Sequence, residues 1–380
     1  MKILIAPDSF KGSLSAIRVC DIIEQGIREV FDDAIITKVP VADGGEGTVE
    51  AIRVAAQCEV VSETVTGPLG KPVWASYAIL PDRTALIEMA AASGLLLTES
   101  ATRDPLKATT YGTGELIRSA LGHGCRRIVV GLGGSATNDG GMGMARALGY
   151  RFLDAKGNEL GFGGGELGRL KTIDASGRDS RIEACEFVAA CDVRNPLCGE
   201  TGASAVYGPQ KGASPEMVRM LDDNLIQLAC VVQEALGADI AEKPGAGAAG
   251  GLGGGLMAFC GAAIAGGIDI VLDLMEFDRM LSGADLVITG EGRMDFQTAF
   301  GKVPVGIAKR AKRQNKPVLA FTGEIGTGAE ALYALGIDAI MSIENRPISL
   351  EEAISNAEYL LKDAAVRAMR MIRMGDMGMR

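Results

Sequence analysis

Three glycine-rich loops of the sequence also carry acidic or hydroxyl side chains, at residues 43–47, 131–141 and 289–295. Backbone N–H groups exposed by such turns can bind phosphate oxygens, and neighbouring carboxylates can hold Mg²⁺. A nucleotide-dependent phosphoryl transfer needs both, together with a lysine or arginine that meets the developing charge. Each loop alone is better explained as a tight turn, so it is the occurrence of three such loops together that favours phosphate chemistry.

Two familiar nucleotide motifs fit poorly. Gly301-Lys302-Val303 lacks both the preceding glycine and the following serine or threonine of a P-loop. Gly131, Gly133 and Ala136 follow a predicted strand and match the shortened dinucleotide fingerprint, but Asn-Asp-Gly-Gly at 138–141 stands where the helix should already run. A nicotinamide-dependent hydroxy-acid dehydrogenase therefore remains the weaker alternative, and a sugar-acid sensor without catalytic activity is a third class to test.

The sequence contains a single histidine, His123, within Gly-His-Gly directly after an apolar helical pattern. This position predicts a residue at the C-terminus of a helix. One imidazole cannot supply the histidine-rich zinc sites, and this placement makes a Ser-His-Asp triad improbable. A general base should therefore be a carboxylate or a lysine.

Composition narrows the classes of partner. The 380 residues include 52 glycines, but 47% are hydrophobic, which excludes a disordered or collagen-like chain. The net charge of −10 argues against a nucleic-acid partner, whose phosphates require a basic surface. An uncharged stretch at 245–267 is long enough to span a membrane, but glycine and alanine dominate it and no secretory signal is present, so we expect a cytoplasmic protein without a membrane partner.

The predicted elements place these loops at strand ends. Strand–turn–helix units occur twice at the start of the chain and three times after residue 285, and the middle contains antiparallel strands followed by further strands and helices. We therefore predict an α/β fold in which a discontinuous parallel-sheet domain (1–60 and 285–380) carries an inserted mixed α/β domain (61–284). Ligands should bind at the carboxyl ends of the strands.

Isolated polar residues follow the same strands. Asp8, Ser9 and Lys11 come just after the first strand, although helix capping explains Asp8 and Ser9 equally well. Asp192 follows the strand predicted at 187–191, and Lys211 lies in a glycine- and proline-containing turn.

Five motifs together resemble the bacterial type 1 glycerate kinase family. They are Ala-Pro-Asp-Ser-Phe-Lys-Gly at 6–12, Ala-Asp-Gly-Gly-Glu-Gly at 42–47, Gly-Leu-Gly-Gly-Ser-Ala-Thr-Asn-Asp-Gly-Gly at 131–141, Tyr-Gly-Pro-Gln-Lys-Gly at 207–212 and Thr-Gly-Glu-Gly at 289–292. The resemblance extends from the first residues to about residue 345. It implies a flavodoxin-like domain with an inserted second domain, and transfer of the γ-phosphoryl group of ATP to D-glycerate with Mg²⁺.

The resemblance also implies the 2-phosphoglycerate product, in glycerate formation from glyoxylate, glucarate or galactarate. Phosphorylation of the 3-hydroxyl stays open as an alternative. The sequence leaves open whether the protein is a monomer or a homodimer.

Position in the loops suggests a role for each candidate residue. Lys11 with Ser9 is expected to bind the glycerate carboxylate, with Asp8 and Lys211 as further substrate contacts. Asp192 is the expected base for the acceptor hydroxyl, with Asp43 as its rival, and Lys11 is a further catalytic candidate. Glu291 and Asp295 are the expected Mg²⁺ ligands. The residues expected to contact the nucleotide are Gly133, Gly134, Ser135, Asn138, Asp139 and Gly290.

Overall fold

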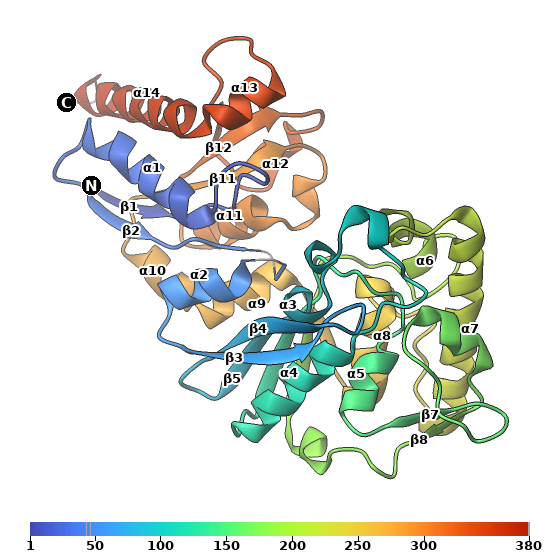
Figure 1. Ribbon diagram of the computed structural model, residues 1–380. Helices are drawn as coiled ribbons and strands as arrows, with labels where there is room; N and C mark the ends of the chain where they lie inside the picture. The colour runs from blue at the N-terminus through green and yellow to red at the C-terminus, as the bar shows by residue number, and fades with distance from the viewer. Residues whose placement is uncertain (43, 46, 379–380) are drawn as a thin grey trace. The chain divides into compact units, whose positions relative to one another are not determined.

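The computed structural model describes residues 1–42, 44–45 and 47–378, without the side chains of 376–378. The chain forms two compact units (Figure 1). Unit 1 comprises residues 1–43, 50–56 and 268–380, and unit 2 comprises residues 44–49 and 57–267. Unit 1 therefore includes residues 268–284, which the sequence analysis assigned to the inserted domain.

Unit 1 contains a five-stranded parallel sheet in the order β13-β12-β11-β1-β2. The central pair joins segments far apart in the chain, because Ile3 of β1 lies opposite Leu286 of β11. Numbered within the unit, the order is 2-1-3-4-5, which confirms the flavodoxin-like fold. The strands are β1 (Lys2–Ile5), β2 (Ile35–Lys38), β11 (Leu286–Met294), β12 (Val318–Ile325) and β13 (Ala339–Ser342).

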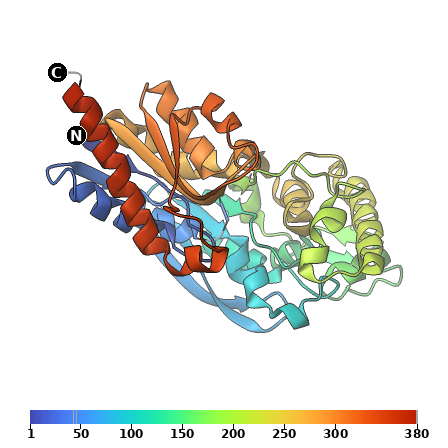
Figure 2. The same ribbon diagram turned by 90° about the horizontal axis from the view of Figure 1, so that it is seen from above.

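Amphipathic helices cover this sheet. The buried residues Val19, Ile23 and Ile27 of α1 pack with Leu361 and Ala364 of α14 over the strands (Figure 2). The residues 268–284 join this unit because buried Arg310 of α11 binds Asp269, Asp273 and Asp278. The helices are α1 (Ala16–Arg28), α2 (Thr48–Ala55, shared with unit 2), α9 (Gly267–Leu274), α10 (Phe277–Ser282), α11 (Val303–Arg313), α12 (Ala331–Ala334), α13 (Leu350–Ser355), α14 (Ala357–Gly378) and η6 (Thr298–Phe300).

Unit 2 contains a six-stranded mixed sheet in the order β10-β9-β6-β5-β4-β3. Its first four strands are parallel, whereas β3 and β4 are antiparallel because short turns connect them. The strands are β3 (Glu59–Thr66), β4 (Pro72–Ile79), β5 (Thr84–Glu88), β6 (Arg127–Gly131), β9 (Glu186–Ala190) and β10 (Ala263–Ala265), with a separate ribbon of β7 (Arg151–Leu153) and β8 (Thr172–Asp174).

The helices of unit 2 bury one large apolar core against this sheet. They are α3 (Met89–Ser93), α4 (Tyr111–Gly122), α5 (Met142–Ala147), α6 (Ala203–Tyr207), α7 (Pro215–Leu236) and α8 (Ala248–Cys260), with short η1 (Leu95–Leu97), η2 (Ser100–Thr102), η3 (Gly164–Arg169), η4 (Ser180–Ala184) and η5 (Pro209–Lys211). As expected, His123 ends α4, and its Nδ1 lies 3.0 Å from the Tyr77 hydroxyl.

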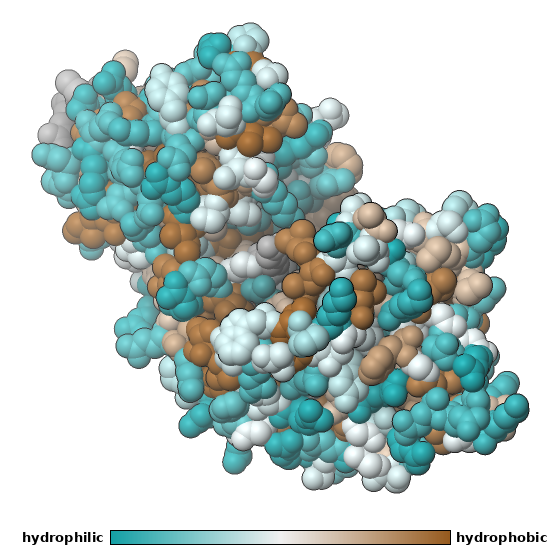
Figure 3. All heavy atoms as spheres, in the orientation of Figure 1, coloured by the Kyte–Doolittle hydropathy of each residue, from teal (hydrophilic) through white to brown (hydrophobic). Residues whose placement is uncertain are grey.

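The glycine- and alanine-rich stretch forms α8, which is interrupted by left-handed backbone at Ala249, Gly250 and Gly251. None of the helices in the described ranges is both long and apolar enough to cross a membrane. On the face shown in Figure 3, hydrophilic residues predominate and hydrophobic ones are scattered between them.

Candidate active site

A cavity of about 540 Å³ lies at the carboxyl edge of the unit 1 sheet. It is lined by residues that follow β1 and β13 and by residues in the C-terminal halves of β11 and β12, so it sits where the strand order reverses between β1 and β11. Parallel α/β sheets bind ligands at this topological switch point. The cavity is therefore the candidate ligand site of unit 1.

The loop after β1 brings Asp8, Ser9 and Lys11 to this cavity. The backbone N–H of Asp8 donates to the Gly290 carbonyl at 2.8 Å, which ties the loop to β11. The N–H of Ser9 donates to Asp8 Oδ1 at 2.6 Å, and the Ser9 hydroxyl lies 3.2 Å from the same oxygen. Ser15, and neither Asp8 nor Ser9, caps the following helix, so capping is the wrong explanation for these two residues.

Glu291 is buried at the base of the cavity. Its Oε1 accepts a hydrogen bond from the Thr298 hydroxyl at 2.5 Å, and its Oε2 lies 3.5 Å from Lys302 Nζ. Burial raises the pKa of Glu291, while the bond from Thr298 and the charge of Lys302 oppose that rise. Lys302 thus adds a cation at the edge of the cavity, where the sequence analysis had named none beyond Lys11.

Asp295 is also buried and lies near Glu291, because the Thr298 hydroxyl that donates to Glu291 accepts from the Asp295 N–H at 3.2 Å. Asp295 Oδ1 accepts from the Gln297 N–H at 2.8 Å, and Oδ2 lies 3.2 Å from Arg293 Nε. Within the described residues no group of three or more potential metal-ligating side chains occurs. Two carboxylates suit a Mg²⁺ ion that takes its other ligands from water and phosphate.

Gly290 has a different place from the one expected for a nucleotide contact. It lies inside β11, and a Cβ at this position would stand 2.4 Å from the Phe321 carbonyl oxygen. Close packing of β11 against β12 therefore requires this glycine, and Gly290 is absent from the cavity lining.

In unit 2 the loop 131–141 follows β6 and Asp192 follows β9, so the two lie at the same carboxyl edge. The backbone at residues 44 and 45 passes directly over this loop. A Cβ on Gly131 would lie 2.0 Å from the Gly44 carbonyl oxygen. Asp43, the rival base, lies outside the described residues.

The tip of this loop leaves backbone donors available. Gly133 and Gly134 are at the surface and Ser135 is largely buried. Among the hydrogen bonds formed by the described residues, the carbonyl of Gly134 accepts from Leu95 at 2.8 Å, but none uses the N–H groups of 133–135 as donors. Three successive unpaired amides are suited to phosphate oxygens.

Asn138 and Asp139 are fully buried beneath this tip, which is the reverse of the exposure that nucleotide contact requires. Asp139 accepts from the N–H of Thr110 at 2.8 Å, from the Thr110 hydroxyl at 2.9 Å and from the N–H of Gly143 at 3.1 Å. Burial raises the pKa of Asp139 and these bonds oppose the rise. Asn138 donates to the Ser204 hydroxyl at 3.0 Å. Both side chains hold the loop in shape.

Lys211 is likewise buried, with 1% of its surface exposed. Its Nζ donates to the Thr137 carbonyl at 2.7 Å, inside the same loop. Burial lowers the pKa of Lys211 to about 7, and the nearby charge of Asp139 opposes that shift. In this structure Lys211 therefore supports the loop from within and does not offer its ammonium to a substrate.

The kinked helix α8 supports the loop from another side. A Cβ on Gly250 would lie 1.9 Å from the Thr137 carbonyl oxygen, and the N–H of Gly140 donates to the Gly250 carbonyl at 3.0 Å. The glycines of 245–267 stand in no motif with a recognisable chemical role. Their role here is to let two backbones approach.

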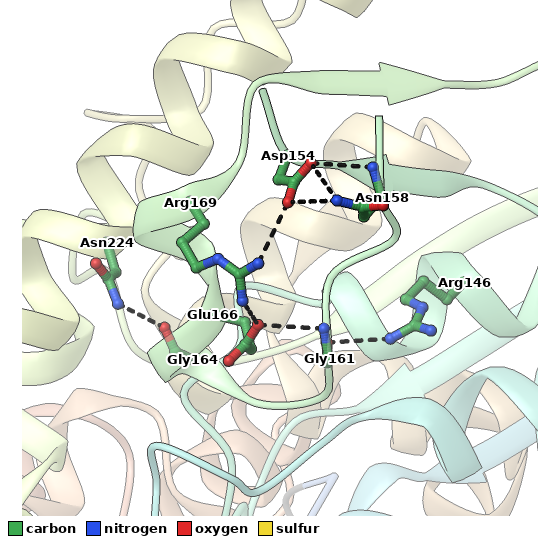
Figure 4. Close-up of polar contacts among 8 residues, drawn as sticks. All are labelled: Arg146, Asp154, Asn158, Gly161, Gly164, Glu166, Arg169 and Asn224. Carbon is green, nitrogen blue, oxygen red and sulfur yellow. Dashed lines mark hydrogen bonds and ion pairs between the residues drawn. The ribbon is translucent and has the colours of Figure 1, made fainter. Parts of the chain in front are cut away.

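A polar network in unit 2 holds the segment 154–169 in place (Figure 4). Arg169 donates to Glu166 at 2.9 Å and to Asp154 at 3.3 Å, and Asn224 donates to the Gly164 carbonyl at 2.8 Å. The fixed backbone at Gly164 lies against the Asn138 carbonyl, which a Cβ would approach to 2.3 Å.

Asp192, the expected base, is exposed at the end of β9. Its Oδ1 accepts a hydrogen bond from the Gly267 N–H at 2.9 Å. The carboxylate is thus oriented by backbone and remains open to solvent, as a group that exchanges protons with a substrate must be.

Comparison with known proteins decides the family. The model of the glycerate kinase family matches residues 3–373. The chain belongs to the glycerate kinase family. It is 51% identical to a glycerate kinase of Bacillus subtilis (strain 168), over 96% of each chain, and 52% identical to a glycerate 2-kinase of Escherichia coli (strain K12), over 94% of each chain.

A solved structure supports the same assignment. The crystal structure named for glycerate kinase 2 of Salmonella typhimurium LT2 superposes with a TM-score of 0.88 at 51% identity and covers 99% of both chains. Glycerate kinases are phosphotransferases, so the family disfavours both the dehydrogenase and the sensor alternatives.

Proposed function

We propose that this chain transfers the γ-phosphoryl group of ATP to the 2-hydroxyl of D-glycerate and releases 2-phospho-D-glycerate and ADP. The observation that carries the proposal is the match to glycerate kinases along nearly the whole chain, including 52% identity to a glycerate 2-kinase. The 3-hydroxyl is the alternative acceptor. Phosphorus NMR of the product separates the two.

In this proposal the cavity of unit 1 binds the acid. Lys11 supplies the cation for the glycerate carboxylate, and Ser9 and the Asp8 carboxylate meet the hydroxyl groups. Lys302, next to Glu291, meets negative charge that develops on the transferred group. The free amides at 133–135 receive phosphate oxygens of ATP.

The proton of the acceptor hydroxyl goes to a carboxylate. As the acceptor oxygen forms its bond to the γ-phosphorus, the bond to the β–γ bridging oxygen breaks and ADP leaves with that electron pair. We assign the proton to Asp192, whose orientation is fixed by the Gly267 amide. Asp43 is the rival.

Glu291 and Asp295 are the residues that would hold Mg²⁺, through one carboxylate each or through water. When bound, the ion would neutralise phosphate charge. Both carboxylates have cationic partners, Lys302 and Arg293, which can turn toward phosphate instead. We further propose a cytoplasmic enzyme, active as a monomer or homodimer, that acts in glycerate formation from glyoxylate or from glucarate and galactarate.

A coupled assay for ADP against a panel of hydroxy acids tests the activity. We expect ADP release with D-glycerate only. Asp192→Asn should lower kcat by about a hundredfold or more, because a positioned base contributes about 10²–10⁴, and should leave glycerate binding measurable by calorimetry.

The matched control for Asp192→Asn is Asp223→Asn, which changes an exposed aspartate on α7 of the same unit. Near-normal kcat in Asp192→Asn would transfer the base to Asp43. ATP consumption without glycerate, or glycerate binding without any ADP release, would overturn the kinase proposal itself.

A further inference from the structure

The cavity of unit 1 has an apolar wall that a small polar acid does not use. The wall is formed by Ile343 after β13 and by Leu350 and Ile354 of α13. Ile343 is buried, whereas Leu350 is 74% exposed and Ile354 is 41% exposed. Two large aliphatic side chains are thus presented to solvent beside a cavity.

The spacing and anchoring of these side chains make them one surface. Leu350 and Ile354 are four residues apart on a helix, so they lie on the same face. The hydroxyl of Ser13 lies 3.4 Å from the Ile354 carbonyl and links α13 to the loop after β1. The end of the apolar wall at Ile354 is therefore attached to the loop that carries Asp8, Ser9 and Lys11.

The size of the cavity points to a second ligand. A volume of about 540 Å³ falls within the range of about 300–1,000 Å³ typical of pockets for drug-sized ligands. Glycerate has three carbons, each bearing oxygen, and offers no apolar face. In the proposed function, the polar side chains of the loop after β1 bind its carboxylate and hydroxyl groups. The apolar part of the cavity is then left for a larger molecule that has a flat apolar group.

Carboxylates stand at the rim of the same region. Glu324 is the second-last residue of β12, and its carboxylate lies 3.6 Å from the Arg293 guanidinium. Glu344 follows β13, where its N–H donates to the Ser342 hydroxyl at 3.1 Å. An acidic side chain at the carboxyl end of a strand is a suitable acceptor for ribose hydroxyl groups in α/β folds. The apolar wall suits a base, and the carboxylates at the rim suit the hydroxyl groups of a ribose, so together they fit a nucleoside.

We propose that this part of the cavity binds the adenosine of ATP, with adenine against Leu350 and Ile354 and the ribose hydroxyls on Glu324 or Glu344. The inference rests on the proposed kinase function, since that function requires a nucleotide. It adds which residues recognise the nucleoside.

Binding of adenosine itself, measured by ligand-observed NMR and calorimetry, tests the proposal without turnover. Leu350→Asp and Ile354→Asp should each weaken adenosine binding about tenfold or more, because each replaces apolar contact by an unpaired charge. In the coupled assay both should raise KM for ATP by a similar factor and change KM for glycerate less than twofold. Ile35→Asp is the matched control, an exposed aliphatic residue at the start of β2, away from the cavity.

The outcomes separate the two proposals. Unchanged adenosine binding and unchanged KM for ATP in both variants, with circular dichroism showing that they fold, would overturn the nucleoside site while the kinase function stands. Equal weakening in Ile35→Asp would overturn it too. If adenosine binding depends on Leu350 but the wild-type protein releases no ADP with glycerate, the kinase function fails and the nucleoside site remains.

Discussion

The cavity at the carboxyl edge of the unit 1 sheet and the loop 131–141 at the carboxyl edge of the unit 2 sheet present opposite kinds of chemistry. In unit 1, charged side chains line a cavity, with Lys11 and Lys302 near the carboxylates of Asp8 and Glu291. In unit 2, Asp139 of the loop 131–141 is buried, Lys211 of η5 is buried against the same loop, and backbone amides remain at the loop's tip. The cavity of unit 1 can act through its side chains, whereas the loop 131–141 of unit 2 buries its aspartate and presents backbone amides. Asp192, after β9, is an exposed charged side chain beside this loop.

This difference explains the distribution of glycine. A backbone that is itself the binding surface must be held without side chains of its own, so neighbouring segments approach it at main-chain distance. Gly131 under Gly44 and Gly250 against Thr137 are two such approaches. A cavity built from side chains needs no such approaches around its binding groups.

The largest expected effect comes from breaking the backbone approach in unit 2. Gly250→Ala should cost about 4 kcal/mol of stability or prevent folding of unit 2, because its Cβ would lie 1.9 Å from the Thr137 carbonyl oxygen. Gly261→Ala is the matched control. Both glycines have a positive φ, of 68° and 67°, but nothing lies within 4 Å of a Cβ at Gly261.

We expect Gly261→Ala to lower the free energy of unfolding by about 1–2 kcal/mol, the cost of placing alanine in left-handed backbone alone. Urea unfolding of the two variants measures both losses. Equal losses at the two positions would show that the close approach of α8 to the loop contributes no more than backbone conformation.

The second effect concerns the side-chain chemistry of unit 1. Lys302→Met should lower kcat/KM about a hundredfold, in the range expected for loss of one donor that stabilises transition-state charge, with little change in melting temperature. The control is Lys309→Met, which changes an exposed lysine of α11, the helix that Lys302 precedes. It should leave kcat/KM within twofold. If the two variants behave alike in the coupled assay, Lys302 has no part in catalysis and the contrast between the edges weakens.

The smallest effect is a pH dependence in unit 2. The pKa of Lys211 is about 7 in the folded protein and 10.5 as its ordinary value. Between these values the unfolded chain holds a proton that the folded chain has lost, so stability should rise with pH. The slope is at most about 1.4 kcal/mol for each pH unit.

Urea unfolding of the wild type and of Lys211→Met at pH 7, 8 and 9 isolates this contribution, because the other groups cancel in the difference. We expect the wild type to gain stability with pH relative to the variant. Parallel curves would mean that Lys211 keeps its proton in the folded state, paired with Asp139.

Local patterns in the sequence predicted the fold well. Short apolar runs followed by turns located all five strands of the unit 1 sheet, and the rule for carboxyl ends brought Asp8, Ser9 and Lys11 to the cavity beside Glu291. Their catalytic and binding roles remain predictions.

What local patterns could not show depends on contacts between distant segments. Lys211 looked like a solvated loop lysine, and only its packing under Thr137 reveals a buried ammonium. Residues 268–284 follow the insertion in sequence but join unit 1 through Arg310, a partner some 30 to 40 residues later. No sequence pattern shows that α13 lines the cavity, because this follows only from how the strands pair in the folded sheet. Lys302, which stands seven residues after Asp295 of the acidic loop 289–295, could have been named from the sequence.

The pairing of β1 with β11 has a consequence for synthesis on the ribosome. Strand β1 cannot pair with β11 until Leu286, the partner of Ile3, has been synthesised. The strands of unit 2, by contrast, all lie between residues 59 and 265. During translation the β1–α1–β2 segment emerges first yet can complete its core last. Unit 2 should therefore fold while the first strand is still unpaired on one side, and truncation before residue 286 should leave unit 2 folded and the N-terminal segment sensitive to protease.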